Sequence, residues 1–220
     1  MNRTITVKGT GRIRIKPDYI AVSMEISNTN KVYDAAMNEA ANRIEKIEEA
    51  VCRLGFQKTD LKTIGFNVST EYETVHDEDG RYCQQFGGYN CRYDLSLSFD
   101  FDSKMLAAVI AAIAESNAKP EMNIEFTVKD SQAVSDKLLG DAVRNAKHKA
   151  DVLCVASNCK LSTLVSIDYN WGELDLVSQT RYNLDESIVP MTAKARCVTP
   201  DITPDDINVS DTVTLVWEIE

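Results

Sequence analysis

The chain has 220 residues, 44% of them hydrophobic, so it can bury a core as one large domain or two closely associated ones. Its 34 acidic and 24 basic residues give a net charge of -10 without any lysine or arginine cluster, which makes nucleic acid and anionic membranes poor candidate partners. No run of 18 apolar residues and no charged-then-apolar leader occurs, so we expect neither an integral membrane segment nor a signal peptide. The expected location is the cytoplasm, or the periplasm or cell envelope if the chain is a trimmed mature form.

Two short alternating runs, 5–7 and 13–15, predict a hairpin-like pair at the start of the chain. Gly9 and Gly11 lie between the runs, where a bulge or a bend would fit. Pro17 and Asp18 then predict a turn.

Residues 18–129 carry strand and helix patterns in turn. In the strand patterns apolar and polar residues alternate, so one face of each strand should be buried. Asn30 and Asp102 are the candidate N-caps of the two helices, and Gly55 is a candidate C-terminal residue for the first. The predicted order is β-α-β-β-α-β, with strands at 20–26, 64–72, 89–101 and 122–128 and helices at 37–54 and 106–113.

The longest regular stretch is a helix predicted from about Ser131 to Ser157. Asp130 or Ser131 can cap its start, and Asn158 is a candidate left-handed residue at its end. Because the middle of its buried face is alanine, the helix can approach its neighbour closely. The apolar stripe consists of Leu139, Val143, Ala146, Ala150 and Leu153, widened by Leu138, Ala142 and Ala156.

The region after this helix combines two strands with one long irregular segment. Strands are predicted at 165–171 and 213–219, and residues 172–206 between them hold no sustained period. We therefore predict an α+β fold in a single domain, 1–220. The split βαβ core comprises residues 18–129. Residues 130–220 add the long helix and two further strands. We expect the helices to lie on one face of an antiparallel-rich mixed sheet.

The chain has only two histidines, and neither predicts a catalytic site. His148 lies on the polar side of the long helix between two lysines, with no nucleophile beside it. His76 with Asp77, Asp79 and Cys83 could supply metal ligands, but their spacing matches neither a calcium loop nor a paired-cysteine zinc site. We expect no catalytic residue, no cofactor and no metal.

Six cysteines are too few for a disulfide scaffold. Cys154 and Cys159 lie at a helix C-terminus, where the dipole does not stabilise a thiolate, and Cys83 and Cys91 flank a hairpin connection. We interpret all of them mainly as reduced, structural thiols.

The opening residues 5–11, with Pro17, Asp18 and the strand after them, resemble the start of the SIMPL domain family. That family includes bacterial periplasmic and outer-membrane antigens and an animal kinase-associated protein. Residues 60–63, Gly88 and Tyr89, the alanine-spaced long helix and the final strand are also similar to that family. The resemblance implies a non-catalytic protein that self-assembles and is associated with stress defence or the cell envelope.

Two functional hypotheses follow. In the first, the chain forms homo-oligomers through sheet edges and through apolar residues of the irregular segment. In the second, it binds a small ligand or a metal, with a possible hydrolase activity, at a site under residues 172–206. The candidate self-association residues are Leu174, Leu176, Val177, Tyr182, Leu184, Ile188, Val189 and Met191.

Overall fold

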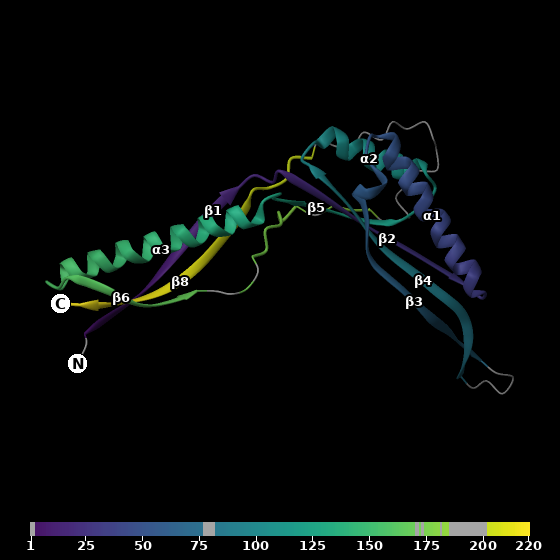
Figure 1. Cartoon of the computed structure of the whole chain (residues 1–220). Coiled ribbons are helices and arrows are strands. Elements are labelled where there is room, and N and C mark those ends of the chain that lie inside the picture. The colour runs from purple at the N-terminus through teal and green to yellow at the C-terminus, as the bar shows by residue number, and fades with distance from the viewer. Residues whose placement is uncertain (1–2, 77–81, 170–171, 173, 181, 185–201) are drawn as a thin grey trace. The chain divides into compact units, whose positions relative to one another are not determined.

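The computed structural model describes residues 3–76, 82–169, 172, 174–180, 182–184 and 202–220 (Figure 1). The chain divides into two compact units. Unit 1 consists of Met1–Asp18, Thr127–Gln179 and Pro204–Glu220, and unit 2 consists of Tyr19–Phe126 and Thr180–Thr203. The α+β class is confirmed, but the predicted single sheet is replaced by two, of three and five strands. Alternation in a strand reveals its buried face and cannot reveal which sheet the strand joins.

Unit 1 is a three-stranded sheet with one long helix on it. The strands lie in the order β1-β8-β6, and both neighbouring pairs are antiparallel. Helix α3 packs mainly on β1 and β8 (Figure 1). The bounds are β1 Thr4–Ile15, α3 Ser131–Ala156, β6 Leu161–Tyr169 and β8 Ile207–Ile219.

Strand β1 is one continuous strand, so the predicted hairpin-like pair at the start of the chain is wrong. It pairs with β8 along its whole length without a register shift. Gly9 and Gly11 are not bulge residues; they lie under α3, where a Cβ on Gly9 would meet Ala146 Cβ at 2.6 Å and the carbonyl oxygen of Ala142 closer still. The glycines therefore serve close packing of a helix on a strand, which confirms the close approach expected from the alanines.

Helix α3 has the predicted ends, but its buried row is shifted. Asp130 accepts a hydrogen bond from Ala133 N at 2.9 Å, and Asn158 is left-handed with φ 55°. The stripe predicted Val143 and Leu153 as buried, yet they are 39% and 48% exposed. The buried residues repeat every four positions because small side chains let one narrow row sit on the sheet: Leu138, Ala142, Ala146, Ala150 and Cys154.

Unit 2 contains the predicted split βαβ core. Its strands lie in the order β3-β4-β2-β5-β7, so the two hairpin strands are followed by the first and last strands of the motif. A core cluster forms between this sheet and the two helices, with Ile20, Ile47, Leu97, Ile113 and Phe126 fully buried. The bounds are β2 Tyr19–Asn30, α1 Tyr33–Arg53, a 3-10 turn at Lys58–Asp60, β3 Leu61–His76, β4 Tyr82–Asp100, α2 Ser103–Glu115, β5 Glu121–Thr127 and β7 Tyr182–Leu184.

Two of the three expected caps of unit 2 are confirmed. Asp102 accepts hydrogen bonds from Lys104 N and Met105 N at 2.8 and 3.2 Å, and Gly55 follows α1 with φ 100°. Asn30 does not cap α1, because the N-cap position is Val32, two residues later, and the helix begins at Tyr33. Its side chain instead accepts a hydrogen bond from Val32 N at 3.0 Å in the turn before the helix.

Candidate functional site

The residues predicted for self-association are divided between unit 1, unit 2 and the part of the chain that the structure does not describe. Leu176 is only 6% exposed and packs with Val128 and Ile207 in a core cluster of unit 1, and Leu174 packs against that cluster. Val177 forms an isolated bridge with Thr127, while Tyr182 and Leu184 belong to β7, which pairs with β5. Ile188, Val189 and Met191 lie outside the described residues. Leu174 and Leu176 thus contribute to the core of their own unit.

Most of the side chains considered for metal binding lie outside the described part of the chain. His148 is exposed on α3, and the side chain of His76, like residues 77–81, lies outside what the structure describes. Among the described residues, no three His, Cys, Asp or Glu side chains are placed to hold a metal ion. The five described cysteines, at positions 52, 83, 91, 154 and 159, are free.

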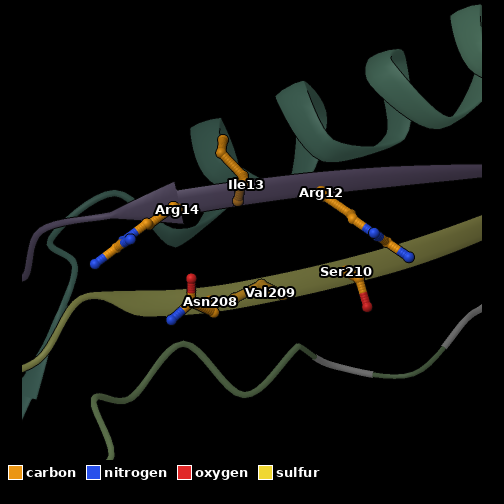
Figure 2. Close-up of a pocket in the computed structure, with 6 residues that line it drawn as sticks. All are labelled: Arg12, Ile13, Arg14, Asn208, Val209 and Ser210. Carbon is orange, nitrogen blue, oxygen red and sulfur yellow. The ribbon is translucent and has the colours of Figure 1, made fainter.

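A hollow of about 450 Å³ lies on the open face of the sheet of unit 1. Arg12 and Arg14 come from β1, and Ser210 and Asn208 lie opposite them on β8 (Figure 2). Arg14 Nε donates to Asp206 Oδ2 at 2.7 Å, so Asp206 already offsets part of the positive charge. This arrangement offers hydrogen-bond donors to a small anion, and none of its lining residues comes from 172–206.

Two groups of contacting aromatic side chains lie on the β3–β4 hairpin and the start of α1. We call them together the aromatic surface: Tyr33, Phe66, Tyr72, Phe86, Tyr89 and Tyr93. Ring contacts connect Tyr33 to Tyr89 at 5.6 Å, Tyr89 to Phe86 at 5.2 Å and Phe86 to Tyr72 at 6.2 Å. All three are edge-on ring pairs, and Tyr72 with Phe86 is a cross-strand pair between β3 and β4, a kind of contact that stabilises a sheet.

Much of the aromatic surface is exposed. Tyr72 is 58%, Phe66 53% and Phe86 39% exposed. The β2–β4 ladder ends at Asn30 and Tyr89, whereas the β3–β4 ladder continues to His76 and Tyr82. Within the described part of the chain, the end of the hairpin therefore consists of β3 and β4 alone. Figure 1 shows this hairpin continuing past the N-terminal end of α1. Sequence reasoning missed this surface because alternation marks its aromatic residues as core residues.

Burial changes the acidity of two groups beside the aromatic surface. Cys91 is fully buried, and this burial raises the pKa of its thiol above the ordinary value. The pKa of Tyr93 is raised as well, first by burial and then by the negative charges that Cys91 and Tyr33 would carry. Both groups are therefore neutral at physiological pH, and neither is poised as a nucleophile.

The two edges of the sheet of unit 1 differ. At the β1 edge, Asn145 Oδ1 of α3 accepts a hydrogen bond from Thr10 N at 3.0 Å, and Lys149 Nζ donates to the carbonyl oxygen of Lys8 at 2.9 Å. These contacts occupy backbone groups that would otherwise template another strand. At the other edge, β6 is exposed from Ser162 to Tyr169, with Val165 and Ile167 both 55% exposed, although two register shifts make it irregular. The sequence predicted one buried face for this strand.

Among the described residues, no helix is both long enough and apolar enough to cross a membrane. The fold and its surfaces thus define an α+β protein built from a split βαβ unit and a three-stranded sheet under one helix. Its exposed apolar side chains are concentrated on the aromatic surface, on β6 and on the outer side of α3.

The family model of SIMPL, described as a protein of unknown function (DUF541), matches residues 5–217, so the chain belongs to the SIMPL family. It is similar to the uncharacterized protein YggE of Edwardsiella ictaluri, with 21% identity over 80% of this chain and 72% of that protein. It is also similar to the 26 kDa periplasmic immunogenic protein of Brucella melitensis, with 27% identity over 74% of this chain and 65% of the relative.

Proposed function

We propose that the chain is a non-catalytic SIMPL protein that assembles with further copies of itself, and that the aromatic surface of unit 2 is a contact between copies. The observation that carries this proposal is the exposed set of contacting rings on a hairpin that ends as two strands. Two strands alone are marginally stable in water, so a further layer over their apolar side would stabilise them. Tyrosine and phenylalanine are also enriched where proteins associate.

A second copy is the favoured occupant, because the surface is compatible with contact between two identical patches. Its rings carry no charge, so two of these surfaces facing each other would not place like-charged groups in the centre of the contact. In a two-fold contact the same patch is used on both copies, as in most soluble dimers. Residues 185–201 remain a second proposed contributor, since they contain Ile188, Val189 and Met191.

The name of the Brucella relative supports an envelope location for this chain as part of the same proposal. The association with stress defence rests on the family resemblance alone. The non-catalytic character rests on the sequence, in which neither histidine lies beside a nucleophile.

The test is the mass of the purified full chain by size-exclusion chromatography with light scattering. We expect an oligomer, and we expect Tyr72→Ser with Phe86→Ser to lower the mass while the helix signal in circular dichroism is kept. Val155→Ser is the matched control, because Val155 is 77% exposed on α3 and lies outside the aromatic surface. A monomeric wild-type chain over a wide concentration range would overturn the proposal.

A second variant separates the aromatic surface from the irregular segment. In this variant a short glycine-serine linker replaces residues 185–201, and Leu176 and Ser178 are kept. Both are buried in unit 1, and Ser178 Oγ donates a hydrogen bond of 2.7 Å to the carbonyl oxygen of Asp205. If only this variant lowers the mass, the segment and not the aromatic surface forms the contact.

Binding of a small anion in the hollow on β1 and β8 is the second candidate function. It is favoured by Arg12 and Arg14, which line the hollow together with Asn208 and Ser210. Inorganic phosphate should then raise the unfolding temperature of the wild-type chain and not that of Arg12→Ala. Equal responses of the two proteins would count against this site.

A further inference from the structure

Two cysteines are held at the end of α3 by a defined backbone motif. Cys159 N donates to the carbonyl oxygen of Cys154 at 3.0 Å, and Asn158 N donates to that of Val155 at 3.3 Å. Asn158 is left-handed between them, with φ 55°. These are the two hydrogen bonds of a Schellman motif, which brings the side chains at its first and last positions into contact. In most helices apolar side chains make that contact, and in this chain two thiols do.

The thiols themselves interact. The Cys159 thiol donates a hydrogen bond to the carbonyl oxygen of Cys154, with Sγ and the oxygen 3.6 Å apart, which places it beside the Cys154 side chain. Cys154 is only 3% exposed, whereas Cys159 is half-buried and thus more accessible to a reagent. Burial, together with the contact with Cys159, raises the pKa of the Cys154 thiol. Cys159 is therefore the thiol from which a reaction with a dissolved partner would start.

The backbone around the pair is fixed on its far side. Lys160 N donates to the carbonyl oxygen of Glu220 at 2.8 Å, and Glu220 N donates to that of Lys160 at 3.0 Å. The turn is thus held between the helix end and the end of β8. The backbone positions of the two cysteines cannot move apart without breaking these hydrogen bonds, and this raises the effective concentration of the two thiols for each other.

We propose that Cys154 and Cys159 form a redox modification site, which a low-molecular-weight disulfide such as oxidised glutathione converts to an intramolecular disulfide. The Cys159 thiolate attacks the glutathione disulfide and releases one glutathione thiolate, leaving a mixed disulfide on Cys159. Cys154 then loses its proton to solvent and attacks the Cys159 sulfur, which expels the second glutathione. Two protein thiols are oxidised by two electrons, and one glutathione disulfide is reduced to two thiols. The product is a covalent ring from Cys154 to Cys159 that locks the turn between α3 and β6.

This inference is independent of the proposed self-assembly, since it concerns one copy and a site in unit 1. The sequence did not predict a redox pair, because a helix C-terminus does not lower a thiol pKa. The structure supports the pair through the proximity of the two thiols. Attack of Cys159 on the dissolved disulfide can be slow, and the intramolecular disulfide is still favoured because Cys154 lies beside Cys159.

Trypsin makes the test direct. Cleavage after Lys149 and Lys160 releases the peptide 150–160, which contains both cysteines and no other. The full chain is equilibrated with mixtures of oxidised and reduced glutathione, and free thiols are then alkylated. Mass spectrometry of the peptide gives the fraction that carries the disulfide. The same synthetic peptide is the reference without the fold. We expect the folded chain to favour the disulfide at least tenfold over the free peptide. Equal or weaker disulfide formation in the folded chain would overturn the proposal.

Single substitutions test the order of the two steps. In Cys154→Ser, Cys159 should collect a glutathione that cannot be resolved; in Cys159→Ser, Cys154 should stay unmodified in the folded chain. Cys52→Ser is the matched control, with a half-buried cysteine in unit 2, and should leave the peptide result unchanged. Equal rates of glutathione addition to Cys154 and Cys159 in these variants would refute the assigned order. If a substituted chain fails to fold, the comparison of wild type with free peptide still decides the proposal.

Discussion

Substitution of Gly9 by alanine tests whether the approach of α3 to β1 holds unit 1 together. An added Cβ would meet Ala146 N at 2.7 Å and Ala146 Cβ at 2.6 Å, and the carbonyl oxygen of Ala142 closer still. Two of these atoms belong to the helix backbone and the third is an alanine Cβ, so no side chain can rotate away and the helix itself must move off the strand. Overpacking of this kind costs about 3 kcal/mol. For a chain of this length that corresponds to a fall of about 6–12 °C in unfolding temperature.

The same substitution at Gly140 is the control. Gly140 lies within α3, and a Cβ there would meet only Arg144 Nη1, at 3.7 Å. Alanine should therefore stabilise the helix by about 0.5–1 kcal/mol. Thermal unfolding followed by circular dichroism should show opposite shifts for Gly9→Ala and Gly140→Ala. A Gly9→Ala chain that unfolds at the wild-type temperature would refute the close packing of helix on strand.

Three further predictions concern unit 2, each measured by equilibrium unfolding. Arg43→Ala should lower the free energy of unfolding by about 2 kcal/mol, because Arg43 donates to the carbonyl oxygens of Ser27, Ala118 and Lys119 at 2.7–2.8 Å. The control Arg53→Ala loses a surface ion pair with Glu49 and should change the free energy of unfolding little. Asp102→Ala should cost about 1 kcal/mol through loss of the cap of α2, and Asp102→Asn should restore most of it; equal losses would contradict the capping role. Burial raises the pKa of the Cys91 thiol above its ordinary value, so its contribution to stability should be fully present below that ordinary pKa and lost as the pH rises through the higher folded pKa; a Cys91→Ala chain whose stability falls equally steeply at alkaline pH would contradict this assignment.

Much of the fold could be predicted from the sequence because local patterns determine it. The split βαβ order, the ends of α3, the cap at Asp102 and the left-handed Asn158 all depend on residues close together in the chain. The sheet to which each strand belongs depends on contacts between distant segments. Nothing in residues 4–15 indicates that β1 pairs with a strand at the other end of the chain. That pairing explains why Gly9 and Gly11 mark a helix contact and not a bend.

The exposed surfaces could not be predicted, because exposure depends on how many helices are available to cover a sheet. Alternation in β3 marks Phe66, Val68 and Tyr72 as one apolar face, and this is correct as local structure. Helix α1 packs on β2 and β4, and at its first residue the ring of Tyr33 contacts Tyr89 of β4. Because α1 does not extend over β3, the apolar face of β3 is largely exposed. The same pattern therefore produces core residues on β2 and exposed rings on β3. The length and position of α1 distinguish the two sets of residues. The variant with Tyr72→Ser and Phe86→Ser should accordingly weaken self-association more than it lowers the free energy of unfolding.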